Sequence, residues 1–178
     1  SSQRQITAFV PLLNAWQLLL SRYSGQNDIQ IGIPVANRQQ AYSGKLIGYF
    51  ASTQVVKAPL EMEESVEISW ERLQKTLTDA QQNQDLPFEQ LVEALDLPRD
   101  NGRAPLFQSL FNLIQLDSDS RFGGFTTERI KLDEGTTLSE IGMQIEQGES
   151  EWFCVLEYSS ELFLQDTMAR YARHYLTL

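Results

Sequence analysis

Apolar residues near the start of the chain recur every three or four positions, which is the spacing of one face of an α-helix. They are Phe9, Leu12, Leu13, Trp16, Leu19, Leu20 and Tyr23. Proline clashes deep inside a helix, so the regular helix begins close to Pro11, and Gly25 is a stop signal after it. We therefore expect an amphipathic helix between these two positions.

Three later segments have the residue pattern of strands. Residues 28–33 alternate between polar and apolar, and Pro34 either ends this strand or lies where the strand is at an edge of the sheet. Leu46–Lys57 and the run LFQSLFNLIQL (106–116) carry apolar residues on both faces. Because strands that are covered on both sides lose the polar alternation, we expect these two to be buried on both faces.

Two helices are predicted in the middle of the chain. Ser65 is suited to cap the first, which runs to about Gln82. Its apolar stripe comprises Val66, Trp70, Leu73, Leu77 and Ala80. The second begins at Pro87, with Glu89 favouring the positive N-terminal end. Its apolar residues Leu91, Val92 and Leu95 are expected to face a core.

The last third of the chain predicts a long connector over 117–137, a hairpin and a final helix. The hairpin has apolar strands at 141–145 and 152–158 around a polar turn at 147–150. Asp166 or Thr167 is expected to cap the helix, whose apolar side is Met168, Tyr171, Tyr175 and Leu176. Strands alternating with helices predict an α/β fold: a mixed-sheet sandwich with helices on at least one face.

Composition narrows the class of protein. The 178 residues are the length of one ordinary domain, and their net charge of -10 disfavours a nucleic-acid partner. No apolar run reaches the ~18 residues of a membrane span, and the start SSQRQITAFVPLL is unlike a signal peptide. Cys154 is the one cysteine, so no internal disulfide forms. We expect a cytoplasmic domain without a membrane or nucleic-acid partner.

Candidate catalytic chemistry is sparse. The single histidine, His174, lies on the predicted final helix, whereas two-histidine metal sites and Ser-His-Asp triads need more than this chain offers. We interpret His174 as a helix-face residue and Cys154 as a small core residue. We expect no catalytic residue and no metal site.

Three stretches match the motifs of one family in order. LIGYFASTQ (46–54) resembles I-G-x-F-V-N-T, NQDLPFEQLVEAL (83–95) resembles H-Q-D-x-P-F-E, and RDNGRAPLFQSLF (99–111) resembles R-D-x-S-R-x-P-L-F. PVANR (34–38) and LLSRYSGQNDI (19–29) are also typical of it. The chain thus resembles the C-terminal half of a condensation domain of a nonribosomal peptide synthetase.

The resemblance implies one lobe of a two-lobed fold similar to chloramphenicol acetyltransferase, with a substrate tunnel between the lobes. The family's H-H-x-x-x-D-G motif, which carries its catalytic histidine, belongs to the N-terminal lobe and is absent here. We therefore expect residues 1–178 to be a C-lobe cut from a longer enzyme, with Ser1 near an artificial boundary. The isolated fragment is predicted to be inactive.

The resemblance also implies partners. They are the N-terminal lobe, donor and acceptor carrier proteins and a neighbouring adenylation domain. Substrates arrive on the phosphopantetheine arms of the carriers, and no cofactor binds the lobe directly. The connector 117–137 and the loop at 41–45 are the two candidates for segments that reach the N-terminal lobe.

Eight residues are candidates for the tunnel wall or the lobe interface. They are Asn37, Arg38, Ser52, Gln54, Gln84, Asp85, Arg99 and Arg103. The competing interpretation is structural: Gln84 and Asp85 tie one helix to the next, and Asp85 pairs with Arg99 or Arg103. For Asn37 and Arg38 the alternative is loop capping.

Departures from the family pattern leave the subtype open. Asn83 stands where the family usually has histidine, Ser52 where it has asparagine and Gly102 where it has serine. Two hypotheses remain: half of an amide-forming condensation domain, or half of a non-condensing relative that epimerises, cyclises or recruits another enzyme. The missing N-terminal lobe would separate them.

Overall fold

The computed structural model describes residues 6–38, 43–61, 63–96, 103–116, 121–122, 125–126, 130 and 135–178. In chain order the elements are α1 (Phe9–Ser24), β1 (Gln30–Val35), the 3-10 turn η1 (Ser43–Lys45), β2 (Ser52–Lys57), α2 (Val66–Gln82), α3 (Phe88–Ala94), β3 (Ser109–Gln115), β4 (Arg121–Phe122), β5 (Phe125–Thr126), β6 (Ile141–Gln147), β7 (Trp152–Tyr158) and α4 (Gln165–Tyr175).

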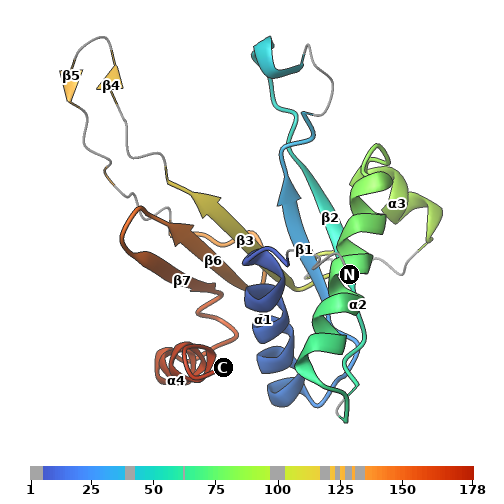
Figure 1. Cartoon of the computed structure of the whole chain (residues 1–178), viewed down its shortest axis with the longest axis vertical. Helices are drawn as coiled ribbons and strands as arrows, with labels where there is room; N and C mark the ends of the chain where they lie inside the picture. Colours follow the sequence, from blue (N-terminus) through green and yellow to red (C-terminus); the bar gives the residue numbers. More distant parts are fainter. Residues whose placement is uncertain are drawn as a thin grey trace, which may run out of the picture.

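Five strands form one mixed sheet in the order β2-β1-β3-β6-β7 (Figure 1). The three central strands β1, β3 and β6 are parallel to one another. The two edge strands are antiparallel to their neighbours, β2 to β1 and β7 to β6. The predicted mixed-sheet α/β fold is therefore confirmed.

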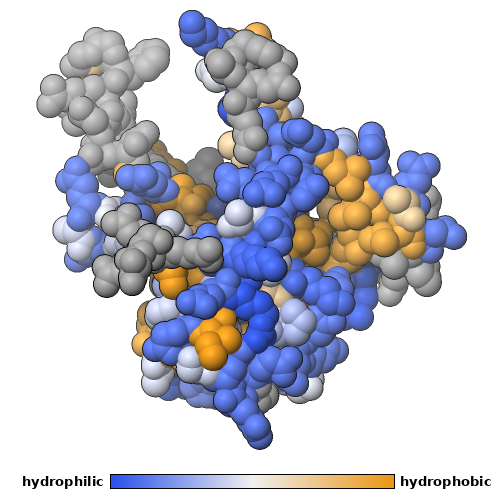
Figure 2. All heavy atoms as spheres, turned by 45° about the vertical axis from the view of Figure 1, so that its right-hand side comes forward, coloured by the Kyte–Doolittle hydropathy of each residue, from blue (hydrophilic) through white to orange (hydrophobic). Residues whose placement is uncertain are grey.

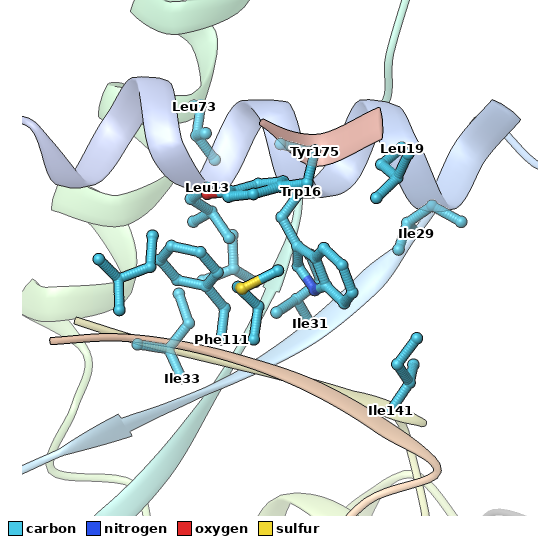
Figure 3. Close-up of a cluster of buried hydrophobic side chains, with 14 of the residues drawn as sticks. Leu13, Trp16, Leu19, Ile29, Ile31, Ile33, Leu73, Phe111, Ile141 and Tyr175 are labelled. Carbon is cyan, nitrogen blue, oxygen red and sulfur yellow. The ribbon is translucent and has the colours of Figure 1, made fainter. Parts of the chain in front are cut away.

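The core lies between α1 and the sheet (Figure 3). Leu13 and Trp16 of α1 are fully buried against Ile31 of β1 and Phe111 of β3. The Trp16 indole Nε1 donates a 2.9 Å hydrogen bond to Ser109 Oγ, which satisfies both polar atoms inside the core. Burial of each such apolar side chain contributes roughly 1.5–3 kcal/mol to the free energy of unfolding, so the packing of α1 on the sheet is a large part of the stability of the core.

The helices α2 and α4 flank α1 on the same side of the sheet (Figure 1). Asn14 of α1 donates a 2.8 Å hydrogen bond to Ser69 Oγ of α2. On the other flank, the Tyr175 hydroxyl of α4 donates to the Leu12 carbonyl at 3.0 Å. Each flanking helix is thus fixed to α1 by a polar contact as well as by packing.

Several predicted elements are confirmed. Pro11 lies in the first turn of α1, and Gly25 ends that helix in the left-handed conformation, with φ 72°. Ser65 caps α2 by accepting a hydrogen bond from the Ile68 amide at 3.5 Å. The predicted hairpin is the β6-β7 pair, and His174 is an exposed residue on the surface of α4.

Other predictions are wrong, mostly because the segments concerned lie at an edge of the sheet. Residues 46–50 precede β2 as a loop, and β2 is an edge strand with one fully buried residue, Val56. Cys154 lies on the edge strand β7 and is exposed, so it is not a core residue. For Pro34, which was predicted to end the strand or to lie at an edge, the second alternative is confirmed: it lies inside β1 where β2 alone still pairs with the strand, because β3 is in register with Ile31 and Gly32.

Two helix predictions and one strand prediction also need correction. Leu95 and Leu176 are exposed because each lies just past the end of its helix, α3 or α4. The helix α4 begins at Gln165 without a side-chain cap, so Asp166 lies in its first turn. In β3 the buried residues, Ser109 and Phe111, lie on one face only, because the helices cover a single face of the sheet.

Two segments project from one end of the sheet (Figure 1). The first is the β1-β2 loop with η1, and the second is the ribbon of β4 and β5, which belongs to the predicted connector 117–137. They share an end because they follow the carboxyl ends of the parallel strands β1 and β3. Among the described residues, no helix combines the length and apolar character needed to cross a membrane.

Candidate functional site

A pocket of about 240 Å³ opens beside the base of the β1-β2 loop, at the junction of α2 and α3. Its polar lining comprises Asn37, Ser52, Thr53, Gln84, Asp85 and Glu89. Tyr49, Phe50 and Phe88 supply aromatic walls. Four of the eight candidate residues thus meet at one place: Asn37, Ser52, Gln84 and Asp85.

The β1-β2 pair places Asn37 and Ser52 together. Val35 is opposite Ser52 in the antiparallel register, so the chain leaves β1 directly beside the start of β2. Asn37 has φ 48°, a left-handed conformation that asparagine tolerates better than most residues. The chain therefore turns at a residue that itself lines the pocket.

Arg38 holds the loop rather than lining the pocket. Its guanidinium donates 3.0 Å hydrogen bonds to the carbonyl oxygens of Leu46 and Gly48. It also lies over the Phe50 ring, with Cζ 4.3 Å from the ring centroid. This cation–π contact orients an aromatic wall of the pocket.

Gln54 and Gln84 both lie near the C-terminal end of α2. Gln54 Nε2 donates a 2.8 Å hydrogen bond to the Ala80 carbonyl in the last turn of α2, a C-terminal cap supplied by β2. Gln84 follows α2 and is only 9% exposed, and its Nε2 has no hydrogen-bond acceptor. Gln54 therefore has a structural contact, whereas Gln84 leaves a buried donor at the pocket wall.

Aromatic packing links α3 to the sheet behind the pocket. Phe88 of α3 packs against Phe107, with ring centroids 5.7 Å apart. Phe107 in turn lies against Gly32 of β1, where a Cβ atom would come within 2.6 Å of the ring. The stretches NQDLPFEQLVEAL and RDNGRAPLFQSLF thus meet through these two phenylalanines.

Arg103 is separate from this pocket. It forms an ion pair with Glu140 at 2.7 Å and lines a second cavity of about 540 Å³ with Tyr23 and Tyr171. Of the two partners predicted for Asp85, Arg103 is therefore excluded, because it pairs with Glu140. Arg99, the other proposed partner, lies outside the described residues.

The described residues that line the pocket offer binding groups but no nucleophile or proton-transfer group with a hydrogen-bond partner. His174 is not part of its lining; its Nδ1 lies 2.9 Å from the Tyr23 hydroxyl. Within the described ranges, no group of His, Cys, Asp and Glu has the arrangement of a metal site. Amides, hydroxyls and carboxylates in such a cavity recognise a polar group and orient it.

Sequence reasoning missed the other seven lining residues, which are Tyr49, Phe50, Ala51, Thr53, Pro87, Phe88 and Glu89. All seven lie inside the stretches LIGYFASTQ and NQDLPFEQLVEAL. The signal was therefore present in those stretches. What the sequence lacked was the register that brings the two stretches together.

Comparison with known proteins decides the family. A profile described as Condensation domain matches residues 2–178. This chain belongs to the condensation-domain family. The assignment agrees with the order of the motifs that converge on the pocket.

Curated relatives of this condensation-domain chain are much longer than it. It is 35% identical over 178 residues to tyrocidine synthase 3 from Brevibacillus parabrevis and 32% identical over 177 residues to gramicidin S synthase 2 from Brevibacillus brevis. The alignments cover 99% and 97% of this chain but only 3% and 4% of those proteins. The chain is thus similar to a small part of each synthase.

Solved structures share the fold. The condensation domain of the monacolin K polyketide synthase MokA has a TM-score of 0.83 at 18% identity, over 96% of this chain and 40% of that one. The X-domain in complex with OxyB from teicoplanin biosynthesis has a TM-score of 0.82 at 22% identity, over 97% and 39%. At these identities the likeness establishes the fold and not the activity.

Proposed function

We propose that this chain is the second lobe of a condensation domain that joins carrier-bound aminoacyl or peptidyl thioesters through an amide bond. The observation that carries the proposal is coverage: the chain aligns over nearly its whole length with about 40% of a solved condensation domain. That share fits one lobe of a two-lobed fold.

The proposed contribution of the lobe is the wall of the substrate tunnel and a surface on which carrier proteins dock. Amide formation needs two reactants held close together and a group that orients or deprotonates the amine. The pocket at the junction of α2 and α3 supplies orienting groups, and the family's catalytic histidine motif has no counterpart in this sequence. The isolated chain is therefore inactive in this proposal.

The two projecting segments are proposed to reach the other lobe. The β1-β2 loop carries apolar side chains that this lobe leaves in solvent: Ile47 is fully exposed and Tyr49 is 92% exposed. Exposed apolar groups gathered in one segment favour a protein interface. In the same proposal, the partners beyond the other lobe are donor and acceptor carrier proteins, with their phosphopantetheine arms, and an adenylation domain.

A second candidate function is a lobe of a non-condensing relative. The observation in its favour is that an epimerization domain of tyrocidine synthetase and the teicoplanin X-domain share this fold, with TM-scores of 0.69 and 0.82. Ser52 stands where condensation domains usually have asparagine, which also leaves the subtype open.

Complementation of the two lobes tests the proposal. Donor and acceptor carrier proteins are loaded, and amide product is measured with this chain alone, the other lobe alone and the mixture. We expect product only in the mixture. Product from this chain alone would contradict the absence of a catalytic group. No product from lobes that co-sediment as a complex would favour the non-condensing relative.

A further inference from the structure

The outer side of β7 is a sheet edge without the usual protection. β7 is the last strand in the order β2-β1-β3-β6-β7, and within the described part of the chain no strand pairs with its outer side (Figure 1). Natural edge strands commonly carry a lysine, a proline or a bulge that prevents further pairing. β7 has no lysine, arginine or proline, and its seven residues pair with β6 without interruption. This edge is therefore able to accept another strand.

The opposite edge of the sheet is different. Both α2 and α3 contact β2, and Gln54 of β2 donates its side-chain hydrogen bond to the Ala80 carbonyl of α2. β2 also ends at a charged residue, Lys57, which forms an ion pair with Asp28. Helices and charge thus protect β2, and β7 has neither on its outer side among the described residues.

The hydrogen bonds to β6 show which backbone groups of β7 point outward. Gly148 N–H donates to the Glu151 carbonyl at one end of the β6-β7 pair, and Ser159 N–H donates to the Glu140 carbonyl at the other end. Hydrogen-bonded and non-hydrogen-bonded pairs alternate along antiparallel strands, so the odd-numbered residues of β7 bond to β6. The N–H and C=O groups of the even-numbered residues point outward. These residues are Trp152, Cys154, Leu156 and Tyr158.

Apolar side chains on both faces of β7 accompany this open backbone. Trp152 is 43% exposed and Phe153 is 51% exposed. Leu156 and Tyr158 pack against the core, so the even-numbered side chains lie on the helix side of the sheet and the odd-numbered ones on the other side. A strand added at this edge would cover apolar surface on both faces while its backbone pairs with β7.

A second copy of β7 is self-complementary with this edge. A twofold axis perpendicular to the sheet places two β7 strands antiparallel, with the helices of both copies on the same side. The register centred on Val155 pairs all seven residues of the strand and brings the outward backbone groups of the two copies together. Its cross-strand pairs are Trp152–Tyr158, Phe153–Glu157, Cys154–Leu156 and Val155–Val155.

Charge favours that register over its neighbours. Glu157 is the one charged residue of β7, and Glu151 directly precedes the strand. In the register centred on Val155, each of these glutamates faces an uncharged residue. A register centred on Cys154 would place Glu151 directly opposite Glu157, and like charges in such pairs are destabilising. A shift in the other direction would leave the start of β7 without a partner strand.

We propose that β7 is a dimerisation edge, to which a second copy of this chain adds its own β7 in the register centred on Val155. The two five-stranded sheets then form one continuous sheet, and the outward N–H and C=O groups of each copy are satisfied by the other. The pocket lies beside β2, at the far edge of each sheet, and stays open in the dimer. The inference is independent of the proposed function, because it concerns only the opposite edge.

Sedimentation velocity and cross-linking of this chain test the proposal. We expect a reversible dimer whose fraction rises with concentration and with salt, because the net charge of -10 on each copy is repulsive and salt screens it. Cys154 is the one cysteine of the chain. In the proposed register the two Cys154 residues are diagonal neighbours, so a bis-maleimide with a spacer of ~7–8 Å should link two chains.

Hydrogen exchange followed by NMR gives a readout for each residue. The chain is compared at a concentration where it is monomeric and at one where it is dimeric. We expect dimerisation to slow the exchange of the even-numbered amides of β7, whose N–H groups point outward. The odd-numbered amides, which already bond to β6, should change little.

Two lysine variants separate this register from general repulsion at an edge. Val155→Lys places two lysines directly opposite each other on the twofold axis and should weaken the dimer by about tenfold or more. Phe153→Lys is the matched control, because it adds the same charge to the same face of the same strand. Its lysine lies opposite Glu157 of the second copy, so the dimer should be as tight as the unmodified one or tighter.

Three results would overturn the proposal. They are a chain that stays monomeric to high micromolar concentration, a dimer in which the even-numbered amides of β7 exchange as in the monomer, and equal weakening by the two lysine variants. Slow exchange of those amides in the monomer would also overturn it, since the chain itself would then cover the edge. If Val155→Lys loses its circular-dichroism spectrum, the exchange pattern of the unmodified chain decides.

Discussion

Gly32 sets how closely β1 and the Phe107 ring approach each other. A Cβ atom at Gly32 would lie 2.6 Å from a carbon of that ring and 2.8 Å from the Leu110 side chain. Both neighbours would have to move. Because Phe107 also packs on Phe88, the displacement would extend to the wall of the pocket.

We predict that Gly32→Ala lowers the free energy of unfolding by about 1–3 kcal/mol, the usual cost of overpacking. Urea denaturation followed by circular dichroism measures it. Gly142→Ala in β6 is the matched control, because its added Cβ would meet neighbours at 3.6–3.7 Å, an ordinary contact distance. Equal midpoints for both variants would contradict the close approach.

Tyr175 makes the stability of the folded state depend on pH in the alkaline range. Burial, and to a lesser extent the charge of a Cys154 thiolate, raises the pKa of Tyr175 well above its ordinary value. The folded state therefore holds the phenolic proton more tightly than the unfolded state, whose tyrosines titrate near ~10. The stabilisation is fully present below about pH 10 and is lost as the pH rises above it.

We predict that the free energy of unfolding falls above about pH 10 and that Tyr175→Phe makes this fall shallower. One proton that is retained only in the folded state corresponds to at most ~1.4 kcal/mol per pH unit. Urea denaturation at a series of pH values measures the slope. Tyr49→Phe, at a 92% exposed site, is the control for loss of a phenol. An unchanged slope in Tyr175→Phe would count against this account.

The structural role of a single residue could be predicted from the sequence where local backbone conformation alone determines it. Gly25 ends α1 through its left-handed conformation, and Ser65 begins α2 by accepting one hydrogen bond. The sequence pattern indicated both. The left-handed conformation of Asn37 and the orphan amide of Gln84 were not predictable. Each depends on residues that are distant in sequence and arrive only when the chain folds.

At the scale of elements, strand existence was easier to predict than strand burial. The run 46–57 has the composition of a buried strand, yet only its second half forms a strand, β2, and this strand is a partly buried edge of the sheet. Composition cannot distinguish a residue that is buried in its own lobe from one that another lobe covers. The exposed side chains of the β1-β2 loop are consistent with the second case.

The β1-β2 loop depends on Arg38, so we predict that Arg38→Lys loosens it. A lysine cannot make the two-pronged contact with the Leu46 and Gly48 carbonyls, and the loss of about 1–2 kcal/mol raises the population of open loop by roughly tenfold. Chymotrypsin cleavage between residues 46 and 50 should accelerate accordingly. Arg22→Lys, at an exposed position in the last turn of α1, should leave the rate unchanged. A rate in Arg38→Lys equal to that of the control would refute the role of Arg38.

At the scale of the whole molecule, apolar surface remains outside the core. Figure 2 shows apolar side chains gathered on the flank that carries α3, where Leu86 and Leu95 are exposed. Such patches on a monomer mark interaction surfaces. The fold class and four of the candidate residues that line the pocket followed from the sequence. The sequence did not show that Arg103 lines a different cavity from these four residues, because that depends on which end of the parallel strands each motif occupies.

The central claim is that the end of the sheet that carries the pocket and the two projecting segments faces the other lobe. Hydrogen exchange of this chain, measured alone and in complex with that lobe, tests it most directly. We predict slower exchange of the amides in 46–50 and 84–89 in the complex, with α4 unchanged. Protection confined to α4 and β7, with the pocket end exchanging as before, would contradict the account.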